Sequence, residues 1–185
     1  MISYTASDSR QTNRGFTLLE LIISVAIIAL VSTVISQVFF ATTKSNAKAE
    51  IQKEVKQNGD YALGVMERMV RSAGAITSTC SSGGSTTTSL TITNPDFGST
   101  TFGCDSTTGI ARIASSSATG TVYLTSSAVR LGVSCTSSTL AFVCTTVAAV
   151  PKNVKINFTL AQSSTSPDVT EQSSLSFQSF VTVRP

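Results

Sequence analysis

A run of 26 residues, 16–41, contains a single charged side chain, Glu20. Its sequence is FTLLELIISVAIIALVSTVISQVFFA. At 1.5 Å per residue, a helix of this length extends about 39 Å, which is enough to cross a hydrocarbon core of about 30 Å. The alternative is a buried core helix of a soluble protein, but such helices seldom stay apolar on every face for so long. The run therefore predicts a single-pass membrane helix.

The flanks of this run indicate its orientation. Residues 1–15 are polar and carry Arg10 and Arg14 against one acidic residue, Asp8. The positive-inside tendency then places the N-terminus in the cytoplasm and everything after the apolar run on the other side of the membrane. Lys44 and Lys48 follow the run and weaken this argument. We expect a protein of the cytoplasmic membrane whose head lies outside the cytoplasm.

Residues 42–74 change to an amphipathic pattern, with apolar residues at steps of three and four from Ala47 to Ala73. These steps predict one apolar helical face. Gly59 and Gly64 lower helix propensity by about 1 kcal/mol each relative to alanine, so we expect a bend near 58–60. Gly74 is a natural stop. Because no proline interrupts residues 16–73, the two segments are expected to form one helix of about 58 residues.

Serine and threonine make up about 40% of residues 75–185. A disordered stalk is one interpretation of this composition. Alternating apolar residues favour antiparallel strands instead, at 90–92, 154–160 and 175–183, with a hairpin of 121–125 and 128–131 around Ser126–Ser127. Residues 81–89 and 114–120 are expected to be flexible loops. The predicted fold class is α+β: a long N-terminal helix whose apolar face, 47–73, packs on a small antiparallel β-rich head.

All the cysteines, Cys80, Cys104, Cys135 and Cys144, follow the apolar run. An even number on the non-cytoplasmic side predicts two disulfides. Zinc is the alternative, but neither a CxxC pair nor a histidine supports it. Three pairings are open, and Cys80–Cys104 with Cys135–Cys144 is favoured because such bonds close short loops.

Several classes of function find no support in the sequence. The net charge of +3 is small and the basic residues are scattered, so nucleic-acid binding has little support. The chain has no histidine, which removes the commonest general base and the commonest metal ligand. It also lacks the phosphate-binding, dinucleotide-binding, serine-hydrolase and zinc-protease motifs. We therefore expect no enzyme activity, no cofactor and no metal.

The residues Arg14–Gly15–Phe16–Thr17–Leu18–Leu19–Glu20 precede and open the apolar helix. This stretch closely resembles the type III signal of type IV prepilins and pseudopilins. The resemblance covers residues 10–41 and implies that a prepilin peptidase removes residues 1–15 by cutting between Gly15 and Phe16, and methylates the Phe16 amine. A secretory signal would instead be cut after its apolar region, so this apolar segment would stay in the mature protein.

The resemblance also assigns Glu20 to recruiting an incoming subunit through that amine. A charge inside a membrane helix costs roughly 2.5–3.5 kcal/mol at the bilayer centre and less near the interface. An ion pair between Glu20 and a Phe16 amine would offset this cost and penalise the wrong axial register. The implied partners are other pilin or pseudopilin subunits, the prepilin peptidase and an inner-membrane assembly platform. The implied destination is a pilus or pseudopilus.

Two further segments indicate a subtype. Residues 61–76, YALGVMERMVRSAGAI, and the closing strands VKINFTL and SFQSFVTVR resemble W-type minor pilins and J-type minor pseudopilins. Many major pilins have a proline in the apolar helix near the place where this chain has Gln37. Arg68 and Arg71 are either contact residues or a solvated helix edge with packed stems.

These observations divide the chain into a cleaved leader at 1–15, a transmembrane and assembly helix at 16–41, an amphipathic helix at 42–74 and a Ser/Thr-rich β head at 75–185. The expected function is a minor structural subunit of a type IV pilus or a type II secretion pseudopilus. The alternative is a pilus-borne binding module whose head contacts DNA, a surface or a secreted substrate.

Overall fold

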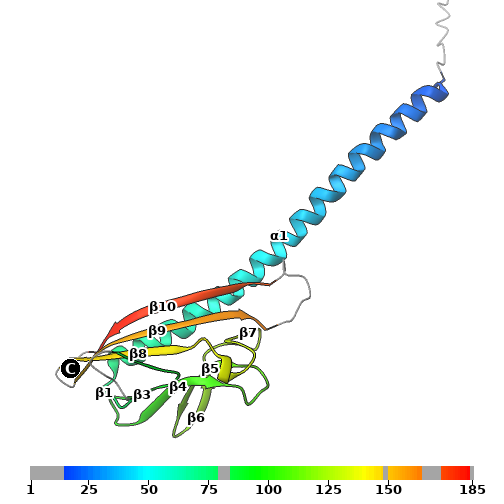
Figure 1. Cartoon of the computed structure of the whole chain (residues 1–185). Coiled ribbons are helices and arrows are strands. Elements are labelled where there is room, and N and C mark those ends of the chain that lie inside the picture. The colour runs from blue at the N-terminus through cyan, green and yellow to red at the C-terminus, as the bar shows by residue number, and fades with distance from the viewer. Residues whose placement is uncertain (1–14, 79–83, 148–149, 164–171, 184–185) are drawn as a thin grey trace, which may run out of the picture. The chain divides into compact units, whose positions relative to one another are not determined.

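The computed structural model describes residues 15–78, 84–147, 150–163 and 172–183. One helix, α1 (Leu18–Ser72), opens the fold and runs through the glycine-containing region 58–60 without a break (Figure 1). The prediction of a single helix is thus confirmed, and the helix ends two residues before Gly74. The chain comprises two compact units, residues 1–43 and 44–185, and α1 belongs to both.

The part of α1 within the first unit is apolar and exposed along its whole length. Among the described residues, α1 is the helix that is long and apolar enough to span a membrane, by its length and composition. No other part of the described chain covers its side chains. The surface of this segment therefore needs an apolar environment that the chain itself does not supply.

The second unit contains two antiparallel sheets. The first has the strand order β1-β3-β4-β5-β6, so that neighbouring strands follow one another along the chain apart from β2. Gly74 leads from α1 directly into this sheet, since its N–H donates to the Thr93 carbonyl at 2.9 Å. The strands are β1 (Ala75–Ile76), β3 (Leu90–Thr93), β4 (Ser99–Asp105), β5 (Arg112–Ser117) and β6 (Gly120–Tyr123).

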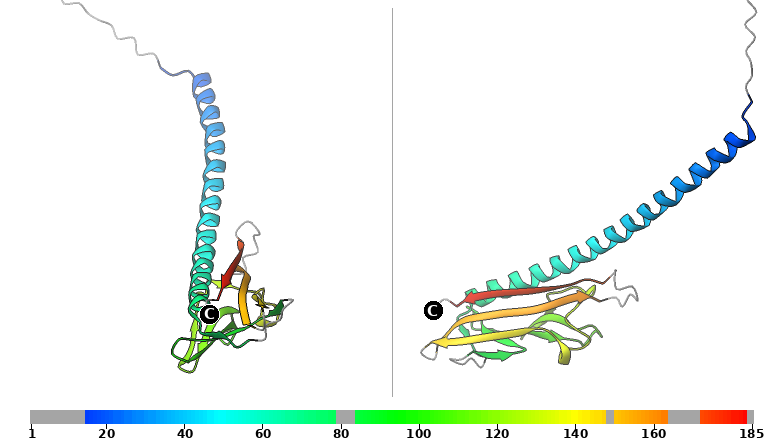
Figure 2. Two further views of the ribbon diagram at one scale, coloured as in Figure 1. Left: turned by 90° about the vertical axis from the view of Figure 1, so that its left-hand side faces the viewer. Right: turned by 45° about the horizontal axis from the view of Figure 1, so that its top comes forward.

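The second sheet has the order β10-β9-β8-β2, with β7 paired to the end of β9. Two views agree that β10 and β9 lie alongside the C-terminal part of α1 (Figures 1 and 2). The predicted closing pair is confirmed, because Phe177 of β10 stands opposite Phe158 of β9. The elements are β2 (Ser85–Thr87), β7 (Val129–Arg130), η1 (Cys135–Ser137), β8 (Ala141–Val147), β9 (Val150–Gln162) and β10 (Ser174–Thr182).

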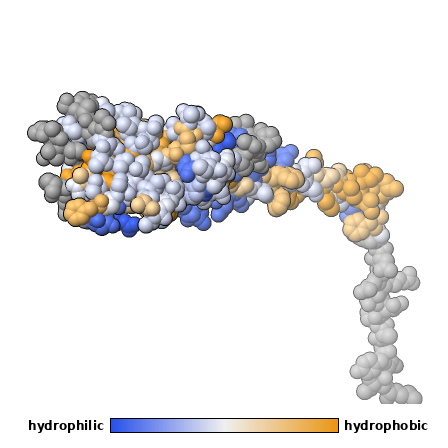
Figure 3. Space-filling model, turned by 90° about the horizontal axis from the view of Figure 1, so that it is seen from below, coloured by the Kyte–Doolittle hydropathy of each residue, from blue (hydrophilic) through white to orange (hydrophobic). Residues whose placement is uncertain are grey.

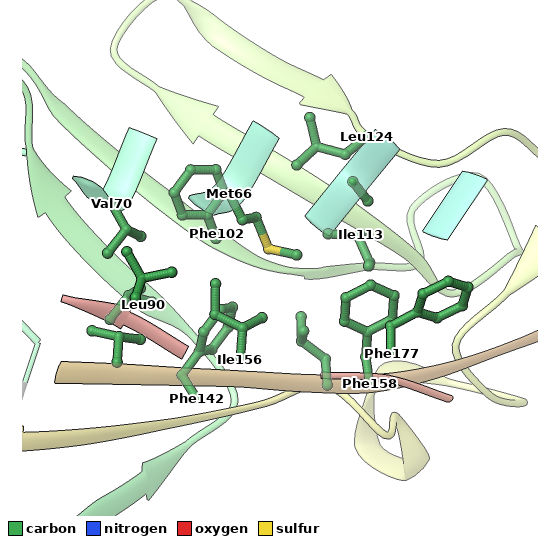
Figure 4. Close-up of a cluster of buried hydrophobic side chains, with 14 of the residues drawn as sticks. Met66, Val70, Leu90, Phe102, Ile113, Leu124, Phe142, Ile156, Phe158 and Phe177 are labelled. Carbon is green, nitrogen blue, oxygen red and sulfur yellow. The ribbon is translucent and has the colours of Figure 1, made fainter. Parts of the chain in front are cut away.

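The hydrophobic core lies between α1 and the two sheets (Figure 4). Met66 and Val70 of α1 are fully buried, as are Phe102 of β4 and Phe142 and Ile156 of the second sheet. Burial of such a side chain stabilises the fold by about 1.5–3 kcal/mol each. The expected packing of the amphipathic helix on a β head is confirmed from Ile51 onward, whereas Ala47, predicted to share the apolar face, is exposed; the fold class is α+β.

The predicted hairpin of 121–125 and 128–131 is wrong. β6 pairs with β5 in the first sheet, whereas β7 pairs with β9 in the second. The backbone N–H of Ser126, at the crossing between the sheets, donates to Asn58 Oδ1 of α1 at 2.7 Å. Ser126, which the hairpin interpretation had placed in the turn, is therefore held by the helix.

The loops expected at 81–89 and 114–120 are also partly wrong. Residues 85–87 form β2, residues 114–117 belong to β5, and residues 81–83 lie outside the described part of the chain. Hydroxyl side chains bond across these strands, as in the contact of Ser116 with Thr121 at 2.9 Å. Serine and threonine in this head therefore take part in the pairing of strands through their side chains.

The favoured cysteine pairing is wrong as well. Cys104, near the end of β4, is bonded to Cys135 at the start of η1, with Cα atoms 5.5 Å apart and a separation of 31 positions in sequence. Cys144 is disulfide-bonded too, and Cys80 lies outside the described residues. The expectation of disulfides in the head is confirmed, but the short-loop argument for their pairing fails, because the sheets bring distant segments together.

Candidate assembly segment

The first turn of α1 is held by its own sequence. The backbone N–H of Glu20 lies 3.3 Å from Thr17 Oγ1 and 3.1 Å from the Thr17 carbonyl, and it donates to both. This is the threonine half of a capping box, the T-x-x-E pattern that precedes many helices. The T-x-x-E pattern can be recognised in the sequence because it stands at the start of an apolar run. Glu20 was predicted only as an assembly residue.

This geometry places Phe16 directly before the helix cap. An amine created on Phe16 by cleavage would stand at the helix N-terminus, where the backbone dipoles already present partial positive charge. Such a cation is unfavourable there unless an anion compensates it. Glu20, in the first turn of α1, is the acidic residue nearest to this end within the described chain. The carboxylate thus has an electrostatic reason to lie at this position.

The bond between Gly15 and Phe16 is open. A side chain built at Gly15 would have no neighbour within 4 Å, and Phe16 is 79% exposed. Neither residue is part of a helix or strand. An accessible peptide bond outside regular secondary structure is what a protease requires, and glycine leaves the approach to it clear. Arg10 and Arg14 lie outside the described residues.

The surface that follows is dominated by exposed aliphatic and aromatic side chains, which form the orange region of α1 in Figure 3. Its large members are all at least half exposed: Leu18, Leu19, Leu21, Ile22, Ile23, Val25, Ile27, Ile28, Leu30, Val31, Val34, Ile35, Val38, Phe39 and Phe40. A contiguous apolar surface of this extent marks a lipid or protein contact.

The hydroxyl groups within this surface are already satisfied. Ser24, Ser32 and Ser36 each donate to the carbonyl four residues earlier, at 2.7–2.8 Å. Thr33 donates to the carbonyl of Leu30 at 2.7 Å. These bonds let a hydroxyl remain in an apolar environment without a partner from outside the helix. The sequence analysis had not considered them, although Ser and Thr within an apolar helix are a readable signal.

The described part of the head has hollows outside this segment, and two of them contain acidic side chains. One, of about 460 Å³, is lined by hydroxyls of β4 and β5, by Asp105 and by the Cys104–Cys135 pair. Hydrogen bonds from the backbone and side chain of Thr107 hold the pKa of Asp105 below its usual value. Asp105 therefore stays anionic near neutral pH, which disfavours a phosphate ligand there. The other hollow, of about 670 Å³, lies along α1 beside Arg68 and Arg71.

The described residues contain no group of three or more His, Cys, Asp or Glu side chains placed to hold a metal ion. Arg71 is exposed, and its guanidinium lies 3.9 Å from the Glu67 carboxylate on the same helix. Arg68 is exposed. The two arginines thus sit together at the edge of a hollow on the helix.

Comparisons with known proteins identify the N-terminal segment. Residues 10–36 match the family model described as the prokaryotic N-terminal methylation motif. Comparison with curated proteins and with solved structures returned no match. The matched residues include the Gly15–Phe16 bond, the Thr17 cap, Glu20 and most of the exposed apolar helix. By this motif and by the apolar helix that follows it, the N-terminal segment of the chain carries the signal of type IV prepilins and pseudopilins.

Proposed function

We propose that the chain is a minor structural subunit of a type IV pilus or of a type II secretion pseudopilus. In this proposal a prepilin peptidase removes residues 1–15 and methylates Phe16. The subunit then remains in the cytoplasmic membrane as a single-pass protein, with its head outside the cytoplasm. An inner-membrane assembly platform moves it into a filament of other pilin or pseudopilin subunits.

The observation that carries this proposal is the exposed apolar half of α1, which starts at the proposed cleavage point. Its hydroxyls are bonded internally, and among the described residues of the run only Glu20 is charged. Such a helix is stable in lipid and equally stable in a bundle of like helices. Glu20 is the exception, and its need for a cationic partner supports assembly through a neighbouring Phe16 amine.

The minor role rests on the resemblance of 61–76 and of the closing strands to W-type and J-type proteins. The β9–β10 pair is compatible with that resemblance. The unbroken helix with Gln37, where many major pilins have proline, supports a minor rather than a major subunit. A minor subunit is present in few copies and primes or ends the filament.

The test is mass spectrometry of filaments sheared from cells that express the chain with its own assembly machinery. We expect a mature chain that begins with N-methylated Phe16 and is present in far fewer copies than the main subunit. Filaments that lack the chain, while the membrane fraction contains it with Met1 still attached, would contradict the proposal. A copy number equal to that of the main subunit would retain the family but reject the minor role.

The binding-module alternative has one favourable observation, the hydroxyl-lined hollow beside Asp105 on the first sheet. Filaments with and without the subunit separate the two functions. If the chain is structural, its deletion lowers filament number while each remaining filament binds DNA, surfaces or secreted proteins as before. If it is a binding module, filament number stays constant and binding falls.

A further inference from the structure

One face of α1 in the head unit points away from the core. Its residues recur every three or four positions and are exposed or half-buried, whereas Val55, Ala62, Met66 and Val70 on the opposite face are buried. We call this surface the outer stripe. It consists of Ala47, Glu50, Lys53, Glu54, Gln57, Tyr61, Gly64, Glu67, Arg68 and Arg71.

Gly64 lies on the outer stripe, and no contact within the described chain requires a glycine at this position. A Cβ at Gly64 would meet nothing within 4 Å, whereas a Cβ at Gly59 would overlap the Phe177 ring. A glycine inside a helix costs about 1 kcal/mol relative to alanine. Gly59 is explained by its packing against β10. Gly64 instead leaves space beside the hollow that Arg68 and Arg71 border, and nothing in the described chain uses that space.

Among the charged side chains on or beside the outer stripe, some form an ion pair with another described residue and others form none. Lys56 and Asp60, at its flank, form an ion pair of 3.0 Å. Glu54 and Arg68 lie on the stripe itself, and no ion pair is formed by either side chain within the described residues. They are 14 residues apart, about four turns and 21 Å, so that they share a face but cannot meet on one helix. Glu54 and Arg68 can therefore form an ion pair with each other only when they belong to two different chains.

We propose that the outer stripe docks a second copy of this chain, parallel to the first and shifted along it by 14 residues. The inference rests on the proposed function, since membrane-anchored subunits of a filament run in one direction. With this shift, Glu54 of one copy faces Arg68 of the other, and Lys53 faces Glu67. Glu50 of the first copy then faces Gly64, where the missing side chain leaves room for it.

Other registers match the charges less well. Without a shift, Arg68 would face Arg68 and Glu54 would face Glu54. With a shift of seven residues, Glu54 would face Tyr61 and Arg68 would also face Tyr61, so neither charge would meet an opposite one. Like charges at facing positions are destabilising by about as much as opposite charges are stabilising. The 14-residue shift places no like charges opposite each other on the stripe, and it uses the two charges that have no ion pair of their own.

The register is tested by cysteine cross-linking of full-length copies in membranes and in filaments. Ala47 and Tyr61 are exposed, uncharged and 14 residues apart, so Ala47→Cys in one tagged copy and Tyr61→Cys in another leave the charges intact. We expect the mixed pair to cross-link under mild oxidation. The matched controls are each variant with itself, Ala47→Cys pairs and Tyr61→Cys pairs, which report an unshifted register and should give little product.

Charge reversal then tests the pairing itself. Adding Glu54→Arg to the Ala47→Cys copy should lower the mixed product about fivefold, and adding Arg68→Glu to the Tyr61→Cys copy should restore it. Lys155→Glu on the second sheet serves as a control that changes charge elsewhere. Stronger cross-linking in the self-pairs, or reversal without restoration, overturns the inference even if both copies enter filaments. Copies that never enter filaments overturn the proposed function and this inference with it.

Discussion

The ring of Phe177 lies against the backbone of Gly59, so that a Cβ on this glycine would overlap the ring. Phe177 is stacked on Phe158, with ring centroids 5.2 Å apart. The position that the sequence analysis interpreted as a bend is therefore the point of close approach between α1 and β10. Glycine is needed here because it lacks a side chain, and the helix continues through it without a break.

We expect Gly59→Ala to destabilise the head by about 1–3 kcal/mol, since the added carbon forces the Phe177 ring out of place. Gly64→Ala is the matched control on the same helix. It adds the same carbon in open space and should raise stability by up to about 1 kcal/mol through helix propensity. Chemical denaturation of the purified full-length protein, followed by circular dichroism, measures both. Equal effects of the two substitutions would contradict the packing role of Gly59.

Asn58 connects α1 to the segment that crosses between the sheets. Its Oδ1 accepts the Ser126 N–H at 2.7 Å, and its amide donates to the Glu54 carbonyl at 3.0 Å. Asn58→Ala should cost about 1 kcal/mol of unfolding free energy and increase hydrogen exchange at Ser126. Gln57→Ala, one residue earlier on the exposed face, should change neither. Unaltered hydrogen exchange at Ser126 in the Asn58→Ala variant would show that this hydrogen bond does not stabilise the segment between the two sheets.

The disulfides allow a direct chemical test. Peptide mapping under non-reducing conditions should recover Cys104 linked to Cys135, and Cys80 linked to Cys144 as the remaining pair. Replacing Cys104 and Cys135 together by serine should cost about 3–4 kcal/mol, as expected for a closed loop of this length. Recovery of Cys80 joined to Cys104 would instead restore the short-loop pairing.

Substitution of Gly15 tests processing separately from folding. Gly15→Val places a branched side chain at the proposed cleavage bond but meets no other residue, so the head should unfold at the same denaturant concentration. We expect a full-length membrane protein that keeps residues 1–15 when the peptidase is present. Immunoblotting for an N-terminal tag detects the leader. Normal removal of the tag would show that cleavage occurs at another bond.

Glu20→Gln removes the charge and keeps the size of the side chain. Membrane insertion should be unchanged or slightly improved, because the desolvation cost falls. Cleavage should continue, but entry into filaments should fall, since an unpaired Phe16 amine in an apolar core costs about 3–5 kcal/mol. Glu20→Asp keeps the charge and should assemble better than Glu20→Gln. Quantification in sheared filaments provides the measurement, and equal incorporation of both variants would reject the pairing role.

Much of the fold could be predicted because the spacing of apolar residues in the sequence agrees with the side chains that are buried in the head. In the head unit, the apolar positions of α1 at Val55, Met66 and Val70 correspond to buried side chains, and so does the alternation of Val154, Ile156 and Phe158 in β9. Strong periodicity over a long segment reflects burial on one face, which is a local property of the sequence. The N-terminal methylation motif is equally local, and the family comparison matches it at residues 10–36.

Strand partners and cysteine partners could not be predicted in this way. β6 and β7 are short, and Ser126 in the segment between them is bonded to Asn58, 68 positions earlier. Cys104 meets Cys135 because β4 ends beside η1, a relation that exists only after the sheets have formed. The outer stripe was missed because its periodicity was used only to find the buried face. An unpaired Glu54 and Arg68 become visible only when the neighbouring ion pairs are known.

The hydroxyls of Ser24, Ser32 and Ser36 donate to carbonyls of their own helix. The free energy of these polar groups therefore changes little when the segment moves between lipid and a bundle of helices. A helix leaving a bilayer for a protein bundle need not break or remake these bonds, so they add no barrier in either direction. The partition equilibrium is then set by side-chain packing and by Glu20. One ionisable group can thereby decide whether the segment resides among lipids or among other helices, and the exchange stays reversible.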